Sequence, residues 1–403
     1  MNPRLALALT FRNARACTDA LYSMVRPTSL FDRPIAERHR IIFYLGHLEA
    51  FDWNLLGRDA LGMASFHAEF DRLFAFGIDP PVGQLQQDRS SDWPSVLEVQ
   101  RYNQRVRQSL DTAVEAIPEH LLQVALEHRL MHAETFAYIL HQLTPDRKMI
   151  PEVPLQLSAP QAVHSMIEIP AGQVTIGRSG KDGFGWDNEY EPHAVHVPSF
   201  SISKYKVTNR QYLAFVRAGA EPPHFWTRDG DRWFWRTMAG AVPLPLEWPV
   251  YVTHQQAVAY ARWVGKTLPT ESQFHHAAYS TPNGEERPYP WGGEPPDPRH
   301  GNFDGRQWDP IPVTASPLGD SAFGVSQMVG NGWEWTSTLF QSLPGFRPFP
   351  FYPGYSAPFF DGGHYVLKGA SARTAARLLR RSFRNWFRPR YPYVYAGFRC
   401  VDN

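Results

Sequence analysis

The segment Glu127-His128-Arg129-Leu130-Met131-His132-Ala133-Glu134 sets two histidines four positions apart. Apolar residues recur around it with a helical period, so we predict a helix from Pro118 to Leu143. Side chains four positions apart lie on one face of a helix, about one turn from each other, and both imidazoles can therefore reach the same ion. Two histidines alone are too few ligands for a tight metal site.

A third histidine lies in another helical pattern of the same part of the chain. Residues 1–146 have few glycine clusters and predict four amphipathic helices, at about 3–25, 35–56, 95–116 and 118–143. Such helices form bundles, and bundles build metal sites from facing helices. His47 belongs to the second helix, so we predict a metal centre of His47, His128 and His132. The remaining histidines of this part are predicted to be structural or solvated: His39, His67, His120 and His141.

The residues alone leave the identity of the ion open. Three neutral imidazoles with open positions suit several divalent ions, and the usual order of affinities does not favour Fe(II) over Zn(II). Glu134 falls off the face that His128 and His132 share. We therefore expect Glu134 to orient a neighbouring group rather than to bind the metal.

Composition and charge exclude several classes of protein. The chain has 403 residues, enough for two domains, and its net charge of +1 lacks the basic excess of a nucleic-acid-binding surface. Its two cysteines, Cys17 and Cys400, are typical of a reducing compartment rather than of a disulfide framework. No stretch approaches the roughly 20 apolar residues of a membrane span. We predict a cytoplasmic protein without nucleic-acid or membrane partners, and its oligomeric state stays open.

The sequence changes in character after residue 146. Residues 147–165 show neither a helical nor a strand period and predict a linker. From residue 166 the chain consists of short strands, turns and aromatic motifs, with two helices predicted at 208–218 and 253–264, each opened by a threonine that can cap it. We therefore predict a helical domain at 1–146 and an α+β domain at 166–403.

Six segments of the second half carry the motifs IPAG (169–172), VTNRQY (207–212), LPTE (268–271), YPWG (289–292), GNGWEWT (330–336) and GFRC (397–400). Together, and in this order, they resemble the formylglycine-generating-enzyme/sulfatase-modifying domain. The resemblance implies an irregular, C-type-lectin-like α+β fold for residues 166–403. The formylglycine-generating members carry a catalytic cysteine pair in the C-terminal part, where this chain has only Cys400, so we do not expect that activity.

A helical bundle with His47, His128 and His132 in front of this domain resembles the ergothioneine-type sulfoxide synthases. These are non-haem iron enzymes with a DinB-like four-helix bundle, and the resemblance spans almost the whole chain. It implies Fe(II), O2 as cosubstrate, and N-α-trimethylhistidine (hercynine) as substrate. Asn385 and Trp386 match the family residues that face hercynine. An indole face attracts a quaternary ammonium and an amide can hold a carboxylate, although a tryptophan packed in a buried turn is the alternative.

Several positions depart from the members of that family that use γ-glutamylcysteine. Met131 stands where ergothioneine-forming members often have glutamine, and Phe387 stands where γ-glutamylcysteine users have an aspartate. A phenylalanine cannot pair with the ammonium of that donor. The catalytic tyrosine expected shortly after the WEWT motif is missing. Tyr352 and Tyr355 could supply the phenol, with core packing as the alternative role for both.

The loop between the second and third predicted helices also departs from the family pattern. Residues 86–92, which include Gln86 and Arg89, offer amides, carboxylates and hydroxyls that suit the hydroxyl groups of a sugar, or form a solvated loop. The altered donor positions indicate a branch other than the γ-glutamylcysteine users. The chain is similar in layout to the selenoneine synthases, and this resemblance implies that it joins a selenosugar to hercynine through a carbon–selenium bond. A sulfoxide synthase that takes cysteine or another thiol is the alternative. The predicted substrate-binding residues are Gln86, Arg89, Met131, Asn385, Trp386 and Phe387.

Two other functions remain possible at this stage. A zinc-dependent DinB-type thiol transferase would use the same three histidines, and it predicts zinc and no uptake of oxygen. A lectin-like binding protein would carry the histidines as structural residues, and it predicts sugar binding that survives their replacement.

Overall fold

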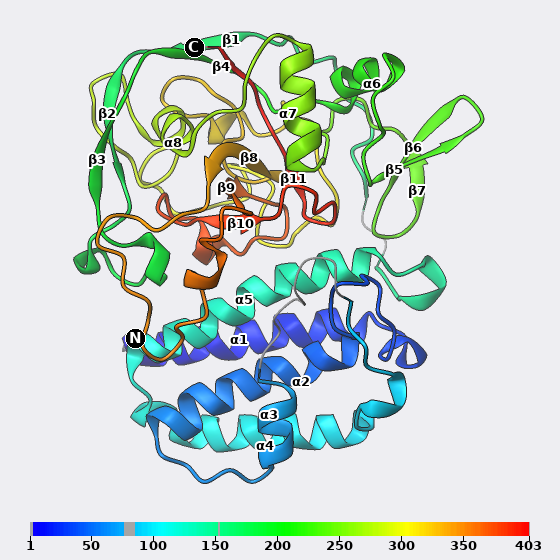
Figure 1. Cartoon of the computed structure of the whole chain (residues 1–403), viewed down its shortest axis with the longest axis vertical. Coiled ribbons are helices and arrows are strands. Elements are labelled where there is room, and N and C mark those ends of the chain that lie inside the picture. Colours follow the sequence, from blue (N-terminus) through cyan, green and yellow to red (C-terminus); the bar gives the residue numbers. More distant parts are fainter. Residues whose placement is uncertain (1–2, 76–84, 152–153, 403) are drawn as a thin grey trace. The chain divides into compact units, whose positions relative to one another are not determined.

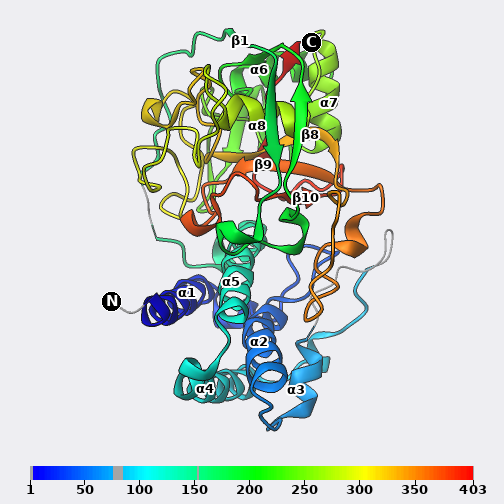
Figure 2. The same ribbon diagram turned by 90° about the vertical axis from the view of Figure 1, so that its left-hand side faces the viewer.

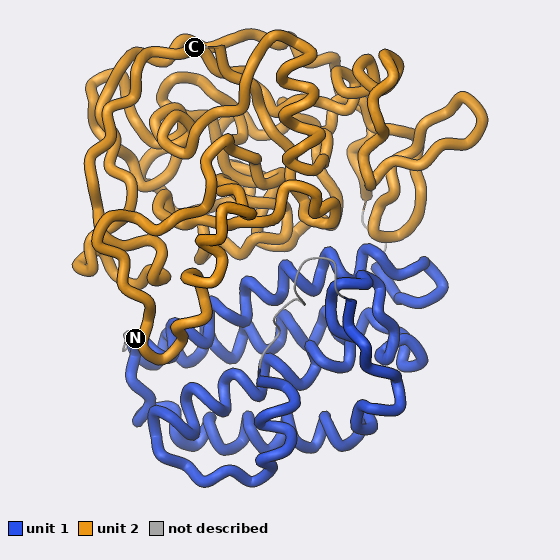
Figure 3. Tube along the Cα trace, viewed as in Figure 1, with its two compact units in different colours: residues 1–151 blue, residues 152–403 orange. Residues whose placement is uncertain are grey.

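The structure is a computed structural model, and it describes residues 3–75, 85–151 and 154–402. The chain forms two compact units, residues 1–151 and 152–403 (Figure 3). The division falls inside the segment 147–165 that the sequence predicts as a linker.

The first unit is a helical bundle, as predicted (Figure 1). Its four long helices are α1 (Pro3–Ser23), α2 (Ile41–Asp52), α4 (Val96–Ala113) and α5 (Glu119–His141). Helix α1 packs against α5, and α2 packs against both α4 and α5. Turns of π-helix, Trp53–Ala60, extend α2, and a short helix that the sequence pattern did not predict, α3 (Ala68–Leu73), packs against α2.

Helix α2 begins six residues later than the predicted start at residue 35. The backbone amide of Ile41 donates to the carbonyl of Asp32 at 3.1 Å, and that of Ile42 donates to Leu30 at 2.7 Å. These amides would otherwise be free groups of the first helical turn. The preceding turn satisfies them, so the helix begins only at Ile41.

Buried charges tie the helices of the first unit together. The guanidinium of Arg129 on α5 lies 2.5 Å from the carboxylate of Asp52 and 3.1 Å from that of Glu49, both on α2. Arg107 on α4 reaches Glu49 at 2.7 Å. Breaking one partner of a buried pair costs about 3–5 kcal/mol, because the other charge is left uncompensated. This network therefore fixes the spacing of the helices that carry the predicted metal ligands.

The second unit is an irregular α+β domain, and its described part contains four small sheets (Figures 1 and 2). The four-stranded sheet has the order β10-β9-β8-β11, in which only the β8–β11 pair is parallel. Its strands are β8 (Gly332–Leu339), β9 (Tyr365–Ala370), β10 (Asn385–Phe387) and β11 (Ala396–Gly397). The others join β1 (Met166–Ile169), β4 (Phe200–Ser203) and β12 (Val401–Asp402); β2 (Gly172–Ile176) and β3 (His193–Val197); and β5 (Trp226–Asp229), β6 (Arg232–Arg236) and β7 (Ala241–Pro243).

Three capped helices accompany these sheets: α6 (Asn209–Arg217), α7 (His254–Trp263) and α8 (Glu271–Tyr279). The hydroxyls of Thr208, Thr253 and Thr270 each accept a hydrogen bond from the backbone amide three residues later. The first two helices and their caps agree with the prediction. The third was not predicted, although its cap belongs to the LPTE motif.

Two motifs of the second unit, GNGWEWT and GFRC, meet at a buried ion cluster. Glu334 of the WEWT motif accepts from Lys206 at 2.6 Å and from Arg399 of the GFRC motif at 2.6 and 3.0 Å, and all three side chains are fully buried. Arg399 also donates to the backbone carbonyls of Lys204 and Ser326, each at 2.9 Å. These segments, far apart in the sequence, are thereby held together by charge-assisted hydrogen bonds.

Candidate metal centre

The structure brings His47, His128 and His132 together. Each offers a ring nitrogen, and these nitrogens lie within 4.8 Å of one another. His47 comes from α2, and the other two come from α5, one turn apart. Glu134 is buried and Met131 half-buried on α5, but neither belongs to the cluster. Among the described residues, no other histidines, cysteines or carboxylates converge in this way.

The direction of the His47 ring is set by a backbone carbonyl. The Nδ1 atom of His47 lies 2.7 Å from the carbonyl oxygen of Phe74. A carbonyl only accepts, so Nδ1 carries the proton and Nε2 presents its lone pair. Aromatic rings brace the ligands as well: Phe43 stacks on His47 with centroids 4.9 Å apart, and Phe51 stacks on His128 at 3.5 Å.

Burial keeps all three imidazoles neutral. It lowers the pKa of His47 to about 4, although the hydrogen bond to Phe74 opposes this shift. Burial, followed by repulsion from neighbouring rings and Arg129, puts the pKa values of His128 and His132 well below their usual range. Metal binding requires the unprotonated imidazole, so no proton has to be displaced from these rings at neutral pH.

The three residues fit a divalent metal ion. Nδ1 of His132 is buried and has no hydrogen-bond partner among the described residues. Three neutral nitrogen ligands on rigid helices leave coordination positions for small molecules. The set suits Fe(II) and also Zn(II), so it does not by itself choose between them.

The other predicted residues of the first unit lie in the segment before α4. Gln86 is half-buried and Arg89 is exposed. Between them, Asp88 pairs with Arg33 and, at 2.9 Å, with Arg40. This carboxylate therefore serves an internal ion pair, and the segment offers fewer polar groups to a ligand than its sequence suggested.

Asn385 and Trp386 lie on β10, at one edge of the four-stranded sheet, and both are half-buried. The ring of Trp386 stacks on Phe340 with centroids 4.1 Å apart and meets the ring of Tyr355 edge-on at 5.4 Å and that of Phe359 at 5.5 Å. Trp386 therefore belongs to an aromatic cluster with a face-to-face contact on one side.

The predicted phenols belong to this aromatic region too. Tyr355 stacks on Trp186, with centroids 4.0 Å apart, and Tyr352 lies 5.6 Å from Tyr355. Burial, helped by the charge of Asp187, raises the pKa of Tyr352 to about 12. Phe387 stacks on Tyr391 at 5.1 Å, so its side chain has a packing partner of its own.

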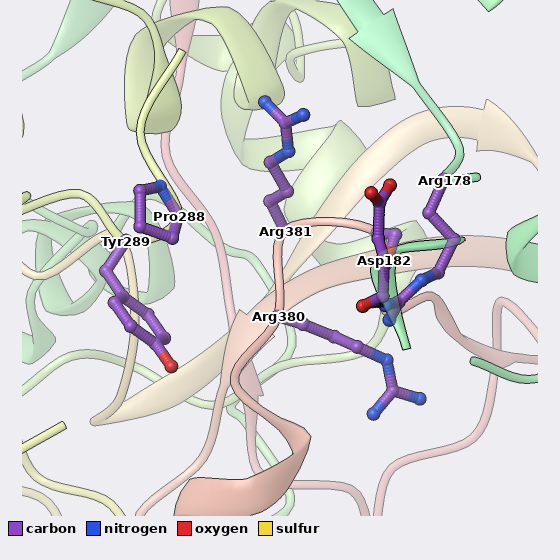
Figure 4. A pocket seen from close by; sticks show the side chains of 7 residues that line it. Arg178, Asp182, Pro288, Tyr289, Arg380 and Arg381 are labelled. Carbon is purple, nitrogen blue, oxygen red and sulfur yellow. Dashed lines mark hydrogen bonds between the residues drawn. The ribbon is translucent and has the colours of Figure 1, made fainter. Parts of the chain in front are cut away.

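A cavity of about 250 Å³ lies in the second unit, lined by residues that include Arg178, Arg380 and Arg381 (Figure 4). Two of these arginines are already paired with carboxylates: Arg380 with Glu189 at 2.5 Å and Arg381 with Glu286 at 3.0 Å. Their side chains diverge from adjacent positions (Figure 4). None of the predicted site residues is among the described residues that line this cavity.

Glu286 gives a prediction for acid stability. Burial alone would raise its pKa, but hydrogen bonds from His275 and from the backbone amide of Thr175, with the charge of Arg381, lower it from 4.5 to about 2. A depressed carboxyl pKa stabilises the fold above pH 4.5, and this stability is lost as the pH falls towards 2. The urea midpoint of the protein should therefore fall more between pH 5 and pH 3 than that of Glu286→Gln.

The matched control for this measurement is Glu285→Gln, because Glu285 is exposed beside Glu286. Its pH dependence should follow that of the parent protein. Equal acid sensitivity of the parent and Glu286→Gln would contradict the assignment.

Two features of the metal centre were not found from the sequence. Phe51 lies four residues after His47, so helical spacing could have indicated that it shares the same face. The carbonyl of Phe74 comes from another element, 27 residues away from His47, and no sequence signal points to it.

Comparison with known proteins adds to this geometry. The Sulfatase-modifying factor enzyme 1-like domain family matches residues 154–403. The hercynine oxygenase of Mycolicibacterium thermoresistibile is 34% identical over 87% of this chain and 83% of its own length. The hercynine oxygenase of Mycolicibacterium smegmatis is 34% identical over 73% of this chain and 74% of its own length. Ergothioneine biosynthesis protein 1 of Neurospora crassa is 28% identical over 94% of this chain and 55% of its own.

Among solved structures, PvdO from Pseudomonas aeruginosa covers 59% of this chain and 93% of its own, at 22% identity and a TM-score of 0.45, which is too distant to add to the assignment. No helix in the described part of the chain is both long and apolar enough to cross a membrane.

Three converging histidines in a helical unit, a sulfatase-modifying-factor domain behind it and 34% identity to hercynine oxygenases together define an oxidoreductase, as the sequence predicted. The chain belongs to the hercynine oxygenase family.

Proposed function

We propose that this protein is an O2-dependent, non-haem iron enzyme that joins a chalcogen donor to the imidazole carbon of hercynine. The observation that carries the proposal is the convergence of His47, His128 and His132, together with membership of the hercynine oxygenase family. Fe(II) held by these residues would supply the open coordination positions and the redox chemistry that oxidative bond formation needs.

In this proposal the protein holds the metal ligands in place and orients their rings. The carbonyl of Phe74 fixes the His47 ring, and stacking on Phe51 limits rotation of the His128 ring. Preorganised ligands keep both substrates in reacting geometry and lower the entropic cost of bringing them together.

The aromatic cluster around Trp386 is the proposed site for the quaternary ammonium of hercynine. A cation within about 6 Å of an aromatic centroid is attracted by the ring face, and a trimethylated nitrogen has no proton to donate to a hydrogen bond. Trp386 and Tyr355 are half-buried, which leaves part of their surface accessible to a ligand. Asn385, next to Trp386, would orient the carboxylate of the amino acid through its amide.

For the donor, we propose a selenosugar, which would make the protein a selenoneine synthase. Phe387 supports this choice because its ring stacks on Tyr391 and offers no charge to the ammonium of γ-glutamylcysteine. The half-buried Gln86 could contribute an amide to the hydroxyl groups of a sugar. Cysteine or another thiol is the second choice, since neither observation names selenium.

The deciding experiment is anaerobic reconstitution with Fe(II), followed by hercynine, O2 and one donor at a time, with products identified by mass. The donors are a selenosugar, cysteine and γ-glutamylcysteine. We expect a carbon–selenium product from the selenosugar. If only γ-glutamylcysteine gives a product, the interpretation of Phe387 is wrong.

Phe387 itself is tested by substitution. Phe387→Asp should increase turnover with γ-glutamylcysteine, because a carboxylate can pair with the donor's ammonium at this position. The control is Phe387→Asn, because asparagine has nearly the same shape as aspartate but carries no charge. Steady-state rates that are the same for both variants would show that the charge at residue 387 does not select the donor.

The zinc-dependent thiol transferase is separated by two measurements. The three histidine ligands also fit zinc, so the metal content of the purified protein should be determined. Oxygen consumption with hercynine and a donor should be recorded on an electrode. If the purified protein contains zinc and takes up no oxygen, even after it has been loaded with Fe(II), the thiol transferase replaces the proposed function.

A further inference from the structure

We propose that the short helix α3 positions the metal ligand His47, and that Gly46 and Asp71 are the positioning residues through which it does so. The inference rests on the proposed metal centre and adds to it a structural support outside the three ligands. Its parts are the contact between α3 and His47, the glycine that permits this contact, and the buried carboxylate that anchors α3.

The residue that caps the C-terminal end of α3 makes the contact with His47. Phe74 follows the last residue of α3 directly, and its carbonyl accepts the hydrogen bond from Nδ1 of His47 at 2.7 Å. The ring of Phe74 is fully buried and lies near the rings of Phe43, Phe70 and Trp93. Because the ring is enclosed, the carbonyl cannot move away from His47 without disturbing this packing.

Gly46 allows the end of α3 to come this close to α2. A Cβ atom at residue 46 would lie 2.6–2.7 Å from three atoms of the Phe74 ring, closer than carbon atoms can approach. Glycine inside a helix costs about 1 kcal/mol relative to alanine. The glycine is therefore unfavourable for α2 by itself, and the approach of Phe74 is the structural reason for its presence.

Asp71 anchors α3 from the other side. Its side chain is fully buried and accepts hydrogen bonds from Tyr102 on α4 at 2.8 Å and from Ser65 at 2.6 Å. Its backbone carbonyl accepts from the side chain of Asn54, in the π-helical extension of α2, at 2.9 Å. The anchored helix therefore ties the Phe74 carbonyl to α4 through Tyr102, and the carbonyl in turn orients His47.

The test is Co(II) binding by Gly46→Ala, compared with Gly57→Ala. Gly57 is the matched control because a Cβ there would also lie 2.6 Å from a buried ring, that of Trp53, which makes no contact with His47 among those the structure records. Affinity is measured by competition with a chelator, ligand geometry by the visible absorption of bound Co(II), and folding by thermal unfolding.

We expect Gly46→Ala to weaken Co(II) binding about 10- to 100-fold, the range found when the outer hydrogen bond of a metal-bound histidine is lost, and to alter the absorption spectrum. Gly57→Ala should bind Co(II) within about twofold of the parent with an unchanged spectrum, whatever its melting temperature. Unchanged binding by Gly46→Ala, or equal weakening in both variants, would overturn the inference. A parent protein that binds no Co(II) would overturn the metal centre itself, and the inference with it.

Tyr102→Phe keeps the proposal testable if Gly46→Ala does not fold. It removes one of the two hydroxyls that hold Asp71 and changes nothing at α2. Its control is Tyr138→Phe, which removes a hydroxyl that accepts a partly buried hydrogen bond from Arg38 at 3.1 Å. We expect weaker Co(II) binding in Tyr102→Phe than in Tyr138→Phe, and equal affinities would contradict the role of Asp71.

Discussion

Replacing His128 with alanine is expected to abolish both metal binding and turnover while the helical bundle stays folded. Among the described residues, His128 is one of three nitrogen ligands that converge, and its removal leaves two, too few to retain the ion. The loss of affinity should exceed the roughly 100-fold that follows from losing an outer hydrogen-bond partner. Metal content after reconstitution, product formation by mass and circular dichroism are the measurements.

His120→Ala is the matched control for this prediction. His120 is exposed near the start of the same helix, so its replacement should leave metal content and turnover unchanged. A His128→Ala protein that still binds one equivalent of metal and forms product would remove the basis of the proposed function. Sugar binding that persists without any turnover in the parent would favour the lectin-like alternative.

Replacing Arg399 with methionine is expected to destabilise the second unit by about 3–5 kcal/mol. The substitution leaves the buried carboxylate of Glu334 with Lys206 as its remaining recorded partner, and it removes the donor from the carbonyls of Lys204 and Ser326. For a domain of this size each kcal/mol corresponds to about 2–4 °C, so the melting temperature should fall by about 6–20 °C. Differential scanning calorimetry measures the effect.

Arg228→Met is the control for Arg399→Met. Arg228 forms an ion pair with Asp231 on the β5–β6 hairpin, and both side chains are exposed. Exposed pairs contribute between zero and about 1 kcal/mol, so the melting temperature should change by only a few degrees. A similar small change for Arg399→Met would show that the cluster around Glu334 does not hold the second unit together.

The family could be predicted from the sequence because each of its motifs is a run of consecutive residues. The segments from IPAG to GFRC already indicated the sulfatase-modifying-factor domain, and the matched residues 154–403 agree with that prediction. The physical role of the motifs was not visible, since Glu334 and Arg399 are 65 residues apart and meet only in the folded core. No sequence motif identifies the side chains that contact the chalcogen donor. The identity of the donor therefore stays a proposal.

Local periodicity determined the four long helices and the pairing of His128 with His132, because both depend on residues within one or two helical turns. The bundle pattern also predicted His47 as the third ligand, and the structure brings it to the other two. Only the tertiary structure decided that Arg129 is held between two carboxylates of α2, and that α3 exists and is followed by the carbonyl that binds His47. Helix α3 has six residues, too few to show a clear helical period, and a single isolated helix of that length is unstable in water. It forms because the buried Asp71 accepts a hydrogen bond from Tyr102 of α4, and this contact arises only when the chain has folded.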